Sequence, residues 1–174
     1  DYGALKSVTD AKSQAIEYGY DSLGRSETVE YPDATMSRIA YNAKGDVASS
    51  VNAKGQKIEW TYDAEGRTTS AVWPDGRTFS WKYDTKGNCT NAYDSVTGAV
   101  SMEYDANERL TRIIYPKGRG LEYSYDAYGR VIQRTTYDDF SASASATQKY
   151  TYDSLGRVSR MTDGEGNLFV ANAY

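Results

Sequence analysis

Aspartate and arginine have the clearest capacity for chemistry in this chain, because they recur four positions apart, as in Asp21 with Arg25 and Asp63 with Arg67. Such pairs could bind an anionic ligand or supply a general acid or base. A catalytic pair should be unique in a chain, whereas these recur at a regular interval. We therefore expect no catalytic residue and no enzymatic activity. Each arginine should stack on an aromatic ring or bridge to its aspartate.

The usual metal ligands are scarce. Histidine is absent, which removes histidine general acid–base catalysis and the commonest zinc ligand. The single cysteine, Cys89, excludes a disulfide within the chain and stands where other repeats carry a small strand hydrophobe. Asp163 to Asn167 spaces three oxygen ligands at alternate positions but lacks the rest of a calcium loop. We expect neither a metal site nor a cofactor.

The composition also bears on partners. The formal net charge is −4, from 20 Lys+Arg against 24 Asp+Glu, and the interspersed charges predict no nucleic-acid binding. No apolar run approaches the ~20 residues of a membrane helix. The first residues lack the basic and apolar regions of a signal peptide, and we expect the chain to be part of a longer protein.

The tyrosine before each aspartate marks an internal repeat. Tyr-Asp, or Tyr-Asn in one copy, recurs with spacings of 21, 21, 21, 21, 21 and 27 residues. These anchor tyrosines are Tyr20, Tyr41, Tyr62, Tyr83, Tyr104, Tyr125 and Tyr152. The longest interval is the same period with a six-residue insertion, which we place in an elongated loop at residues 137–148.

Each period contains two turn signals. The first turn runs from the aspartate to a glycine, as from Asp21 to Gly24. An aspartate that accepts backbone hydrogen bonds and a glycine free to adopt positive φ predict a type I turn with a G1 bulge. The second turn follows about ten residues later, as at residues 73–76 (Trp-Pro-Asp-Gly). Glu108 replaces the glycine in one copy, so we expect that turn to change geometry and to use Asn107.

Residues between the turns alternate in polarity. Positions four and two before each anchor tyrosine are apolar or aromatic in twelve of fourteen cases, as at Ile58 and Trp60. The interleaved positions, such as Glu59 and Thr61, hold no large apolar residue. Successive side chains of a strand point to opposite faces, so we predict strands with one aromatic face and one wet face.

These patterns predict an all-β fold in which tandem 21-residue β-hairpin repeats form one long, curled antiparallel sheet. Seven periods would supply about fourteen strands, and sheets of that size tend to curl. We interpret residues 1–13 as the incomplete end of a preceding repeat and residues 14–174 as an array of about seven repeats. No segment predicts a helix or a second layer.

We assign the signature residues an architectural role rather than a ligand-binding one, with the tyrosines in a cross-strand aromatic ladder. They are Tyr20, Asp21, Gly24, Arg25, Tyr41, Tyr62, Asp63, Gly66, Arg67, Tyr83, Asp84, Gly87, Tyr104, Asp105, Tyr125, Asp126, Gly129, Arg130, Tyr152, Asp153, Gly156 and Arg157.

Tyr-Asp-x-x-Gly-Arg at a period near 21, alternating with Pro-Asp-Gly turns, resembles the YD-repeat or RHS (rearrangement hotspot) family. Full matches lie at residues 20–25, 62–67, 125–130 and 152–157. Elsewhere Asn42 and Asp46 replace Asp and Arg, Asn88 replaces Arg, and Glu108 replaces Gly. The resemblance implies a β-strip that spirals into a hollow shell. Such shells enclose a C-terminal toxic polypeptide in bacterial RHS proteins and insecticidal ABC toxins, and a similar shell belongs to teneurin adhesion receptors.

The resemblance implies a non-enzymatic structural segment of a shell that encapsulates a C-terminal toxin or effector. Its partners would be the remainder of the parent chain, and it would be secreted or at a cell surface, in a bacterium. The alternative is an extracellular adhesion or carbohydrate-binding module that contacts a glycan or protein through the aromatic face or the 137–148 loop. A third hypothesis is that the segment was isolated or engineered to study the repeat itself, so that its only function is to fold.

Overall fold

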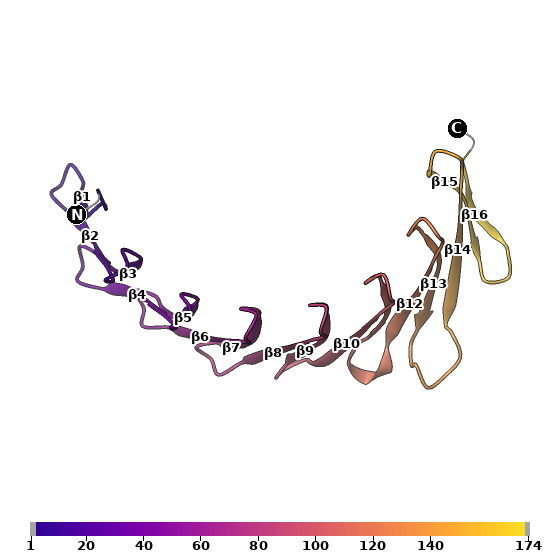
Figure 1. The fold of residues 1–174 in the computed structure, drawn as a ribbon, viewed down its shortest axis with the longest axis horizontal. Coiled ribbons are helices and arrows are strands. Elements are labelled where there is room, and N and C mark those ends of the chain that lie inside the picture. Colours follow the sequence, from indigo (N-terminus) through magenta and orange to yellow (C-terminus); the bar gives the residue numbers. More distant parts are fainter. Residues whose placement is uncertain (1–2, 173–174) are drawn as a thin grey trace. The chain divides into compact units, whose positions relative to one another are not determined.

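The computed structural model describes residues 3–172 of a chain that divides into two compact units, Asp1–Ser80 and Trp81–Tyr174. Its regular structure is β throughout, apart from one 3-10 turn at Pro116–Gly118. Within each unit the strands follow one another in the order of the chain, and neighbouring strands pair antiparallel (Figure 1). The predicted all-β antiparallel sheet of hairpin repeats is confirmed.

The first unit contains seven complete strands and the start of an eighth. They are β1 (Ser7–Thr9), β2 (Ala15–Tyr20), β3 (Ser26–Glu30), β4 (Met36–Tyr41), β5 (Val47–Val51), β6 (Lys57–Tyr62), β7 (Thr68–Val72) and β8 (Thr78–Tyr83).

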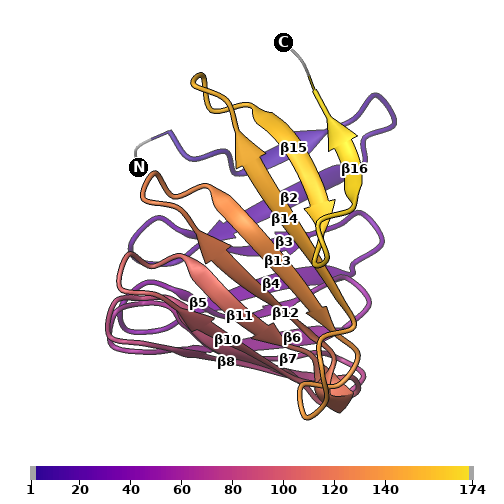
Figure 2. The same cartoon turned by 90° about the vertical axis from the view of Figure 1, so that its right-hand side faces the viewer.

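The second unit contains the end of β8 and eight further strands, several of which Figure 2 shows side by side. They are β9 (Cys89–Asp94), β10 (Gly98–Tyr104), β11 (Leu110–Ile114), β12 (Gly120–Tyr125), β13 (Val131–Tyr137), β14 (Ala146–Tyr152), β15 (Val158–Asp163) and β16 (Leu168–Ala171). Residues 3–172 thus contain sixteen strands instead of the expected fourteen, because the short strands β1 and β16 also pair with their neighbours.

The first turn of each period has the predicted geometry. Gly24 adopts φ 77°, and its N–H donates to the carbonyl of Asp21 at 2.9 Å. The N–H of Asp21 in turn donates to the carbonyl of Arg25 at 2.9 Å, and the β2–β3 register shifts just before the turn. This pattern is a type I turn closed by a G1 bulge, as the Asp and Gly positions require.

The two faces of the sheet differ as predicted. In β6, Ile58 and Trp60 are half-buried, whereas Glu59 and Thr61 are exposed. Trp60 lies across from Ala71 on β7, and Ala71, at 3% exposure, is the one buried hydrophobic residue in the described part of the chain. The sheet is therefore a single layer whose aromatic face is covered only by neighbouring side chains, so nearest-neighbour strand contacts carry its stability.

The six-residue insertion lies in the loop between β13 and β14. This loop is shorter than the predicted loop at 137–148, because β13 ends at Tyr137 and β14 begins at Ala146. The loop folds back onto the sheet instead of projecting as a simple tip. The N–H of Phe140 donates to the carbonyl of Gly118 at 2.8 Å, and its ring stacks on Tyr137 with centroids 4.2 Å apart. Phe140 also occupies the space beside Gly120 that a side chain there would need.

Candidate functional site

The aspartate of the signature is the centre of each first turn. One carboxylate oxygen of Asp63, Oδ1, accepts hydrogen bonds from the N–H groups of Glu65 and Arg67 at 3.0 and 2.9 Å. The other oxygen, Oδ2, accepts from Nε of Arg67 at 2.7 Å. Equivalent Nε contacts, each 2.7 Å long, are made by the pairs Asp21–Arg25, Asp105–Arg109, Asp126–Arg130 and Asp153–Arg157. The carboxylates that sequence pattern singled out are thus hydrogen-bonded within their own turns.

Copies that depart from the signature keep the same geometry with an amide donor. Nδ2 of Asn88 donates to Oδ2 of Asp84 at 3.0 Å, in the place of an arginine. In the pair Asn42–Asp46 the direction of the hydrogen bond is reversed, because the first residue is the donor: Nδ2 of Asn42 donates to Oδ2 of Asp46 at 3.0 Å. A carboxamide supplies both the acceptor and the donor that the turn requires.

Six of the anchor tyrosines connect their repeat to the one before it. The hydroxyl of Tyr41 donates to the backbone carbonyl of Ser26 at 2.8 Å, and Ser26 directly follows the signature arginine of the preceding repeat. The same link joins Tyr20 to Leu5, Tyr62 to Val47, Tyr104 to Cys89, Tyr125 to Leu110 and Tyr152 to Val131. The sequence separation is 15 residues, and it becomes 21 for Tyr152 because of the insertion.

The signature arginine makes a second connection in the same direction. The guanidinium carbon of Arg25 lies 4.1 Å from the ring centroid of Tyr41 in the next repeat. Arg109 lies over Tyr125 at 4.7 Å, and Arg130 over Tyr152 at 4.4 Å. In Arg25, Arg109 and Arg130 both expected roles, stacking on a ring and bridging to the aspartate, therefore occur together, and each of these arginines lies beside the anchor tyrosine of the next repeat.

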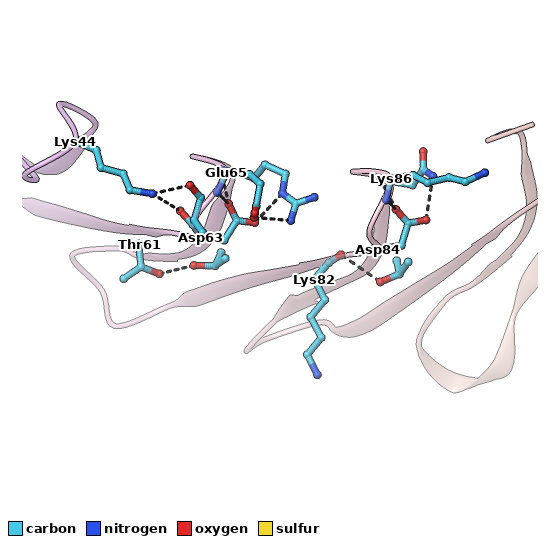
Figure 3. A network of polar contacts seen from close by, with 12 residues as sticks. Lys44, Thr61, Asp63, Glu65, Lys82, Asp84 and Lys86 are labelled. Carbon is cyan, nitrogen blue, oxygen red and sulfur yellow. Dashed lines mark hydrogen bonds and ion pairs between the residues drawn. The ribbon is translucent and has the colours of Figure 1, made fainter.

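Where the signature arginine is missing, a lysine connects the turn to a backbone carbonyl of the next turn, as Figure 3 shows for Lys44. In the first unit, Nζ of Lys44 donates to the carbonyl of Ala64 in the next turn at 2.6 Å. In the second unit, Nζ of Lys86 donates to the carbonyl of Ala106 at 2.8 Å. Sequence reasoning missed this substitution, although its signal was present: a lysine stands two positions before both Asp46 and Asn88.

The protonation of these groups follows their contacts. The pKa of Asp105 is lowered, chiefly because the Arg109 side chain donates a hydrogen bond to its carboxylate. The pKa of Asp84 is lowered, chiefly by the hydrogen bond from the Asn88 side chain. Burial raises the pKa of the Tyr104 hydroxyl. The folded state therefore favours the ionised carboxylates of Asp84 and Asp105 and the protonated hydroxyl of Tyr104, the forms that the turn and the tyrosine link need.

The expectation for Glu108 was wrong. Glu108 adopts φ 64°, and its N–H donates to the carbonyl of Asp105 at 3.0 Å, as a glycine does in the other copies. Asn107 does not take over the left-handed position. The bulge hydrogen bond from the N–H of Asp105 to the carbonyl of Arg109, at 3.0 Å, fixes this backbone although Glu108 is not a glycine.

The remaining candidate residues have local partners. Asp163 accepts hydrogen bonds from the backbone of Glu165 and Asn167 and from the Asn167 side chain, like the aspartates of the first turns. Cys89 is half-buried, and its thiol contacts the carbonyl of Asn91 at 3.4 Å. Between residues 3 and 172, no three His, Cys, Asp or Glu side chains are grouped to hold a metal ion. Within the same range, no helix is long and apolar enough to span a membrane.

The sequence that forms these linked turns matches a known protein family. A sequence model of the Teneurin YD-shell matches residues 1–143. The chain belongs to this family. The YD-repeat assignment made from the signature is therefore confirmed, and the architecture that links one repeat to the next is that of a YD-shell strand array. No curated protein sequence matches the chain.

Solved structures of Tc toxin components have a similar fold. The TcdB2–TccC3–Cdc42 crystal structure is 16% identical to this chain with a TM-score of 0.62, and the TcdB2–TccC3 structure is 16% identical with a TM-score of 0.61. A Tc holotoxin pore of Photorhabdus luminescens is 15% identical with a TM-score of 0.56. Each match covers 97% of this chain and 11% of the toxin chain, so the YD-shell array here spans about a tenth of those proteins.

Proposed function

We propose that the chain is a non-enzymatic wall segment of a YD shell that encloses a C-terminal toxin or effector polypeptide of its parent protein. The observation that carries this proposal is the link between repeats. The residue after a first turn supplies the carbonyl for the next tyrosine hydroxyl, as Ser26 does for Tyr41, and a signature arginine supplies the cation for the next ring, as Arg25 does for Tyr41. A wall built this way can extend from repeat to repeat without a separate hydrophobic core.

The family match and the fold of the Tc toxin components support a role in a shell. In this proposal residues 1–13 are the incomplete end of a preceding repeat, residues 14–174 form about seven repeats, and the signature residues serve the architecture. Residues 1–2 and 173–174 of these ranges lie outside the part of the chain that the structure describes. The aromatic face of the wall is turned toward the enclosed polypeptide. The partners are further repeats and the enclosed domain of the same chain, and the protein is secreted or at the surface of a bacterium.

The absence of catalysis in this proposal rests on how the carboxylates are used. Asp63 accepts three hydrogen bonds within its own turn, and Asp105 and Asp153 repeat the arrangement. A general acid or base needs a proton-transfer position open to substrate and a pKa near the working pH. These aspartates instead have pKa values below the ordinary range.

Limited proteolysis of the full-length parent protein tests the wall. The polypeptide that follows the repeats should resist protease in the intact protein. Replacing both Tyr62 and Asp63 by alanine should expose it, whereas Leu23→Ala, at a turn side chain 75% exposed, should leave it protected. The proposal fails if the following polypeptide is digested equally fast in all three proteins, or if the gene encodes nothing beyond the repeats.

A second candidate, carbohydrate binding, is favoured by one observation. Trp73 is 47% exposed and lines a groove of about 350 Å³ together with Asn52 and Gln56. Its ring is held edge-on against Phe79, with centroids 6.1 Å apart. An exposed indole beside carboxamides could stack on the apolar face of a sugar and bond to its hydroxyls. Glycan-array binding that Trp73→Ala abolishes would support this role, and a soluble monomer without hits would exclude it.

A further inference from the structure

The second unit contains a groove whose chemistry differs from that of the repeated turns. It has a volume of about 420 Å³ and lies along β12 and β13 and the turn that precedes β12. This size falls at the lower end of the range for ligand pockets. The side chains that matter for its chemistry are Tyr115, Pro116, Arg119, Leu121, Arg134 and Thr136.

The strand register places these side chains on the aromatic face. Leu121 pairs with Thr136, and Tyr123 pairs with Arg134. Residues two apart on a strand point to the same side, so Leu121, Arg134 and Thr136 lie on the face that also carries Tyr123. The polar face of the same strands holds a separate cluster, in which Arg112 bonds to Glu122 at 2.6 Å.

The two arginines of the groove lack the ion pair that each signature arginine forms with its turn aspartate. Nη1 of Arg134 donates to the neutral Oε1 of Gln148 at 3.3 Å. Within residues 3–172, no carboxylate pairs with Arg119 or Arg134, and none lines the groove. Two guanidinium groups therefore border one cavity that no carboxylate of the chain lines, beside the apolar side chains of Tyr115, Pro116 and Leu121. Guanidinium forks bind carboxylates in bidentate geometry.

We propose that this groove binds a short acidic peptide segment. Its carboxylate would lie between Arg119 and Arg134, and an adjacent apolar side chain would contact Leu121, Pro116 and the ring of Tyr115. A bare inorganic anion would leave these apolar side chains uncovered, whereas a peptide with alternating acidic and aliphatic residues contacts both parts of the groove. The groove is a local property of β12 and β13, so its binding is independent of whether the wall encloses a cargo.

The test uses the 174-residue chain and an acetylated hexapeptide of alternating glutamate and leucine, with the glutamine–leucine peptide as its matched control. The glutamate peptide should bind, and the glutamine peptide should bind at least tenfold more weakly. Arg119→Gln and Arg134→Gln should each weaken binding about tenfold, as expected for a charge-assisted contact. Arg160→Gln removes the same charge from an exposed position on β15 and should change binding less than twofold.

Amide chemical shifts locate the peptide independently of affinity. The perturbed amides should cluster at residues 119–121 and 134–136. Equal binding of the two peptides, or an equal loss in Arg160→Gln, would show that no specific carboxylate site exists. Shifts confined to the signature turns, or no binding by the folded chain at millimolar peptide, would also overturn the proposal. Unchanged circular dichroism of each variant shows that a loss of binding is not a loss of fold.

Discussion

The hydroxyl of Tyr62 donates a hydrogen bond to the backbone carbonyl of Val47, fifteen residues earlier, at 2.8 Å. Val47 opens the strand after the first turn of the preceding repeat. The tyrosine therefore does not serve its own turn. It fixes the position of the turn before it, and this hydrogen bond needs the hydroxyl of a tyrosine, which a phenylalanine lacks.

Removing that hydroxyl should weaken the array measurably. Tyr62→Phe leaves the carbonyl of Val47 to water and should lower the free energy of unfolding by about 1 kcal/mol. Tyr128→Phe is the matched control, since the Tyr128 side chain is 85% exposed and should change stability by less than about 0.5 kcal/mol. Urea denaturation measures both. Equal effects of the two substitutions would show that the link to Val47 contributes nothing.

The lysine contacts predict a position-specific effect. Lys44→Met removes the bond to the carbonyl of Ala64 and should cost about 0.5 kcal/mol, as for other exposed charged contacts. Lys54 is the control, because it occupies the same position in a second turn and its side chain is exposed. Lys54→Met should leave the urea midpoint unchanged. If it lowers the midpoint as much as Lys44→Met, the contact with Ala64 is not the cause.

Restoring the signature should make Lys44 dispensable. The signature arginine Arg109 makes a similar contact, because its Nη1 donates to the carbonyl of Asp126 in the next turn at 3.1 Å. The double substitution N42D/D46R supplies that donor, so Lys44→Met should cost less in this background than in the natural chain. A double-mutant cycle measures the difference. An unchanged cost would mean that arginine and lysine do not substitute for one another.

The left-handed glutamate predicts a stabilising substitution. A non-glycine residue at positive φ destabilises the folded state by about 1–3 kcal/mol. Glycine relieves this strain, but its greater conformational entropy in the unfolded state offsets part of the gain. Glu108→Gly should therefore raise the unfolding free energy by about 1 kcal/mol. Asn107→Gly, at the neighbouring position without positive φ, should lower it. Thermal unfolding measures the stability of both variants. A Glu108→Gly protein less stable than the natural chain would show that Glu108 is not strained.

The pH dependence should be bell-shaped. Asp105 has a lowered pKa in the folded state, so its contribution is full above about pH 4 and is lost as the pH falls further. Tyr104 has a raised pKa, so its contribution is full below about pH 10 and is lost as the pH rises through its folded value. Urea midpoints across this range measure both limbs. In Asp105→Asn the acid limb should be shallower, and an unchanged limb would contradict the assignment.

The position of Phe140 predicts that Gly120 tolerates no side chain. A Cβ atom there would collide with the Phe140 ring and with the carbonyl of Ile113. Gly120→Ala should cost about 2 kcal/mol through overpacking. Ser124→Ala, an exposed position on the same strand, should be nearly neutral by thermal unfolding. Similar melting temperatures for the two variants would show that the loop does not occupy this space.

Local features of the fold could be predicted from sequence because they depend on residues close together in the chain. The pair Asp21 and Gly24 specifies a bulged turn through its own hydrogen bonds and positive φ. The alternation at Ile58 and Glu59 specifies the faces of a strand. The backbone at Glu108 could not be predicted from the preference of glycine for positive φ, because the hydrogen bonds of the surrounding bulge fix its conformation.

By itself, the sequence determined the 21-residue period, the strand and turn positions and the YD-repeat assignment, all of which follow from local chemistry repeated in register. Only the tertiary structure decided that Tyr62 reaches Val47, that Lys44 replaces a missing arginine contact, and that Arg119 and Arg134 border one groove. These contacts join residues about 15 to 20 positions apart. They depend on which strands lie side by side and in which register, and no single turn or strand encodes that information.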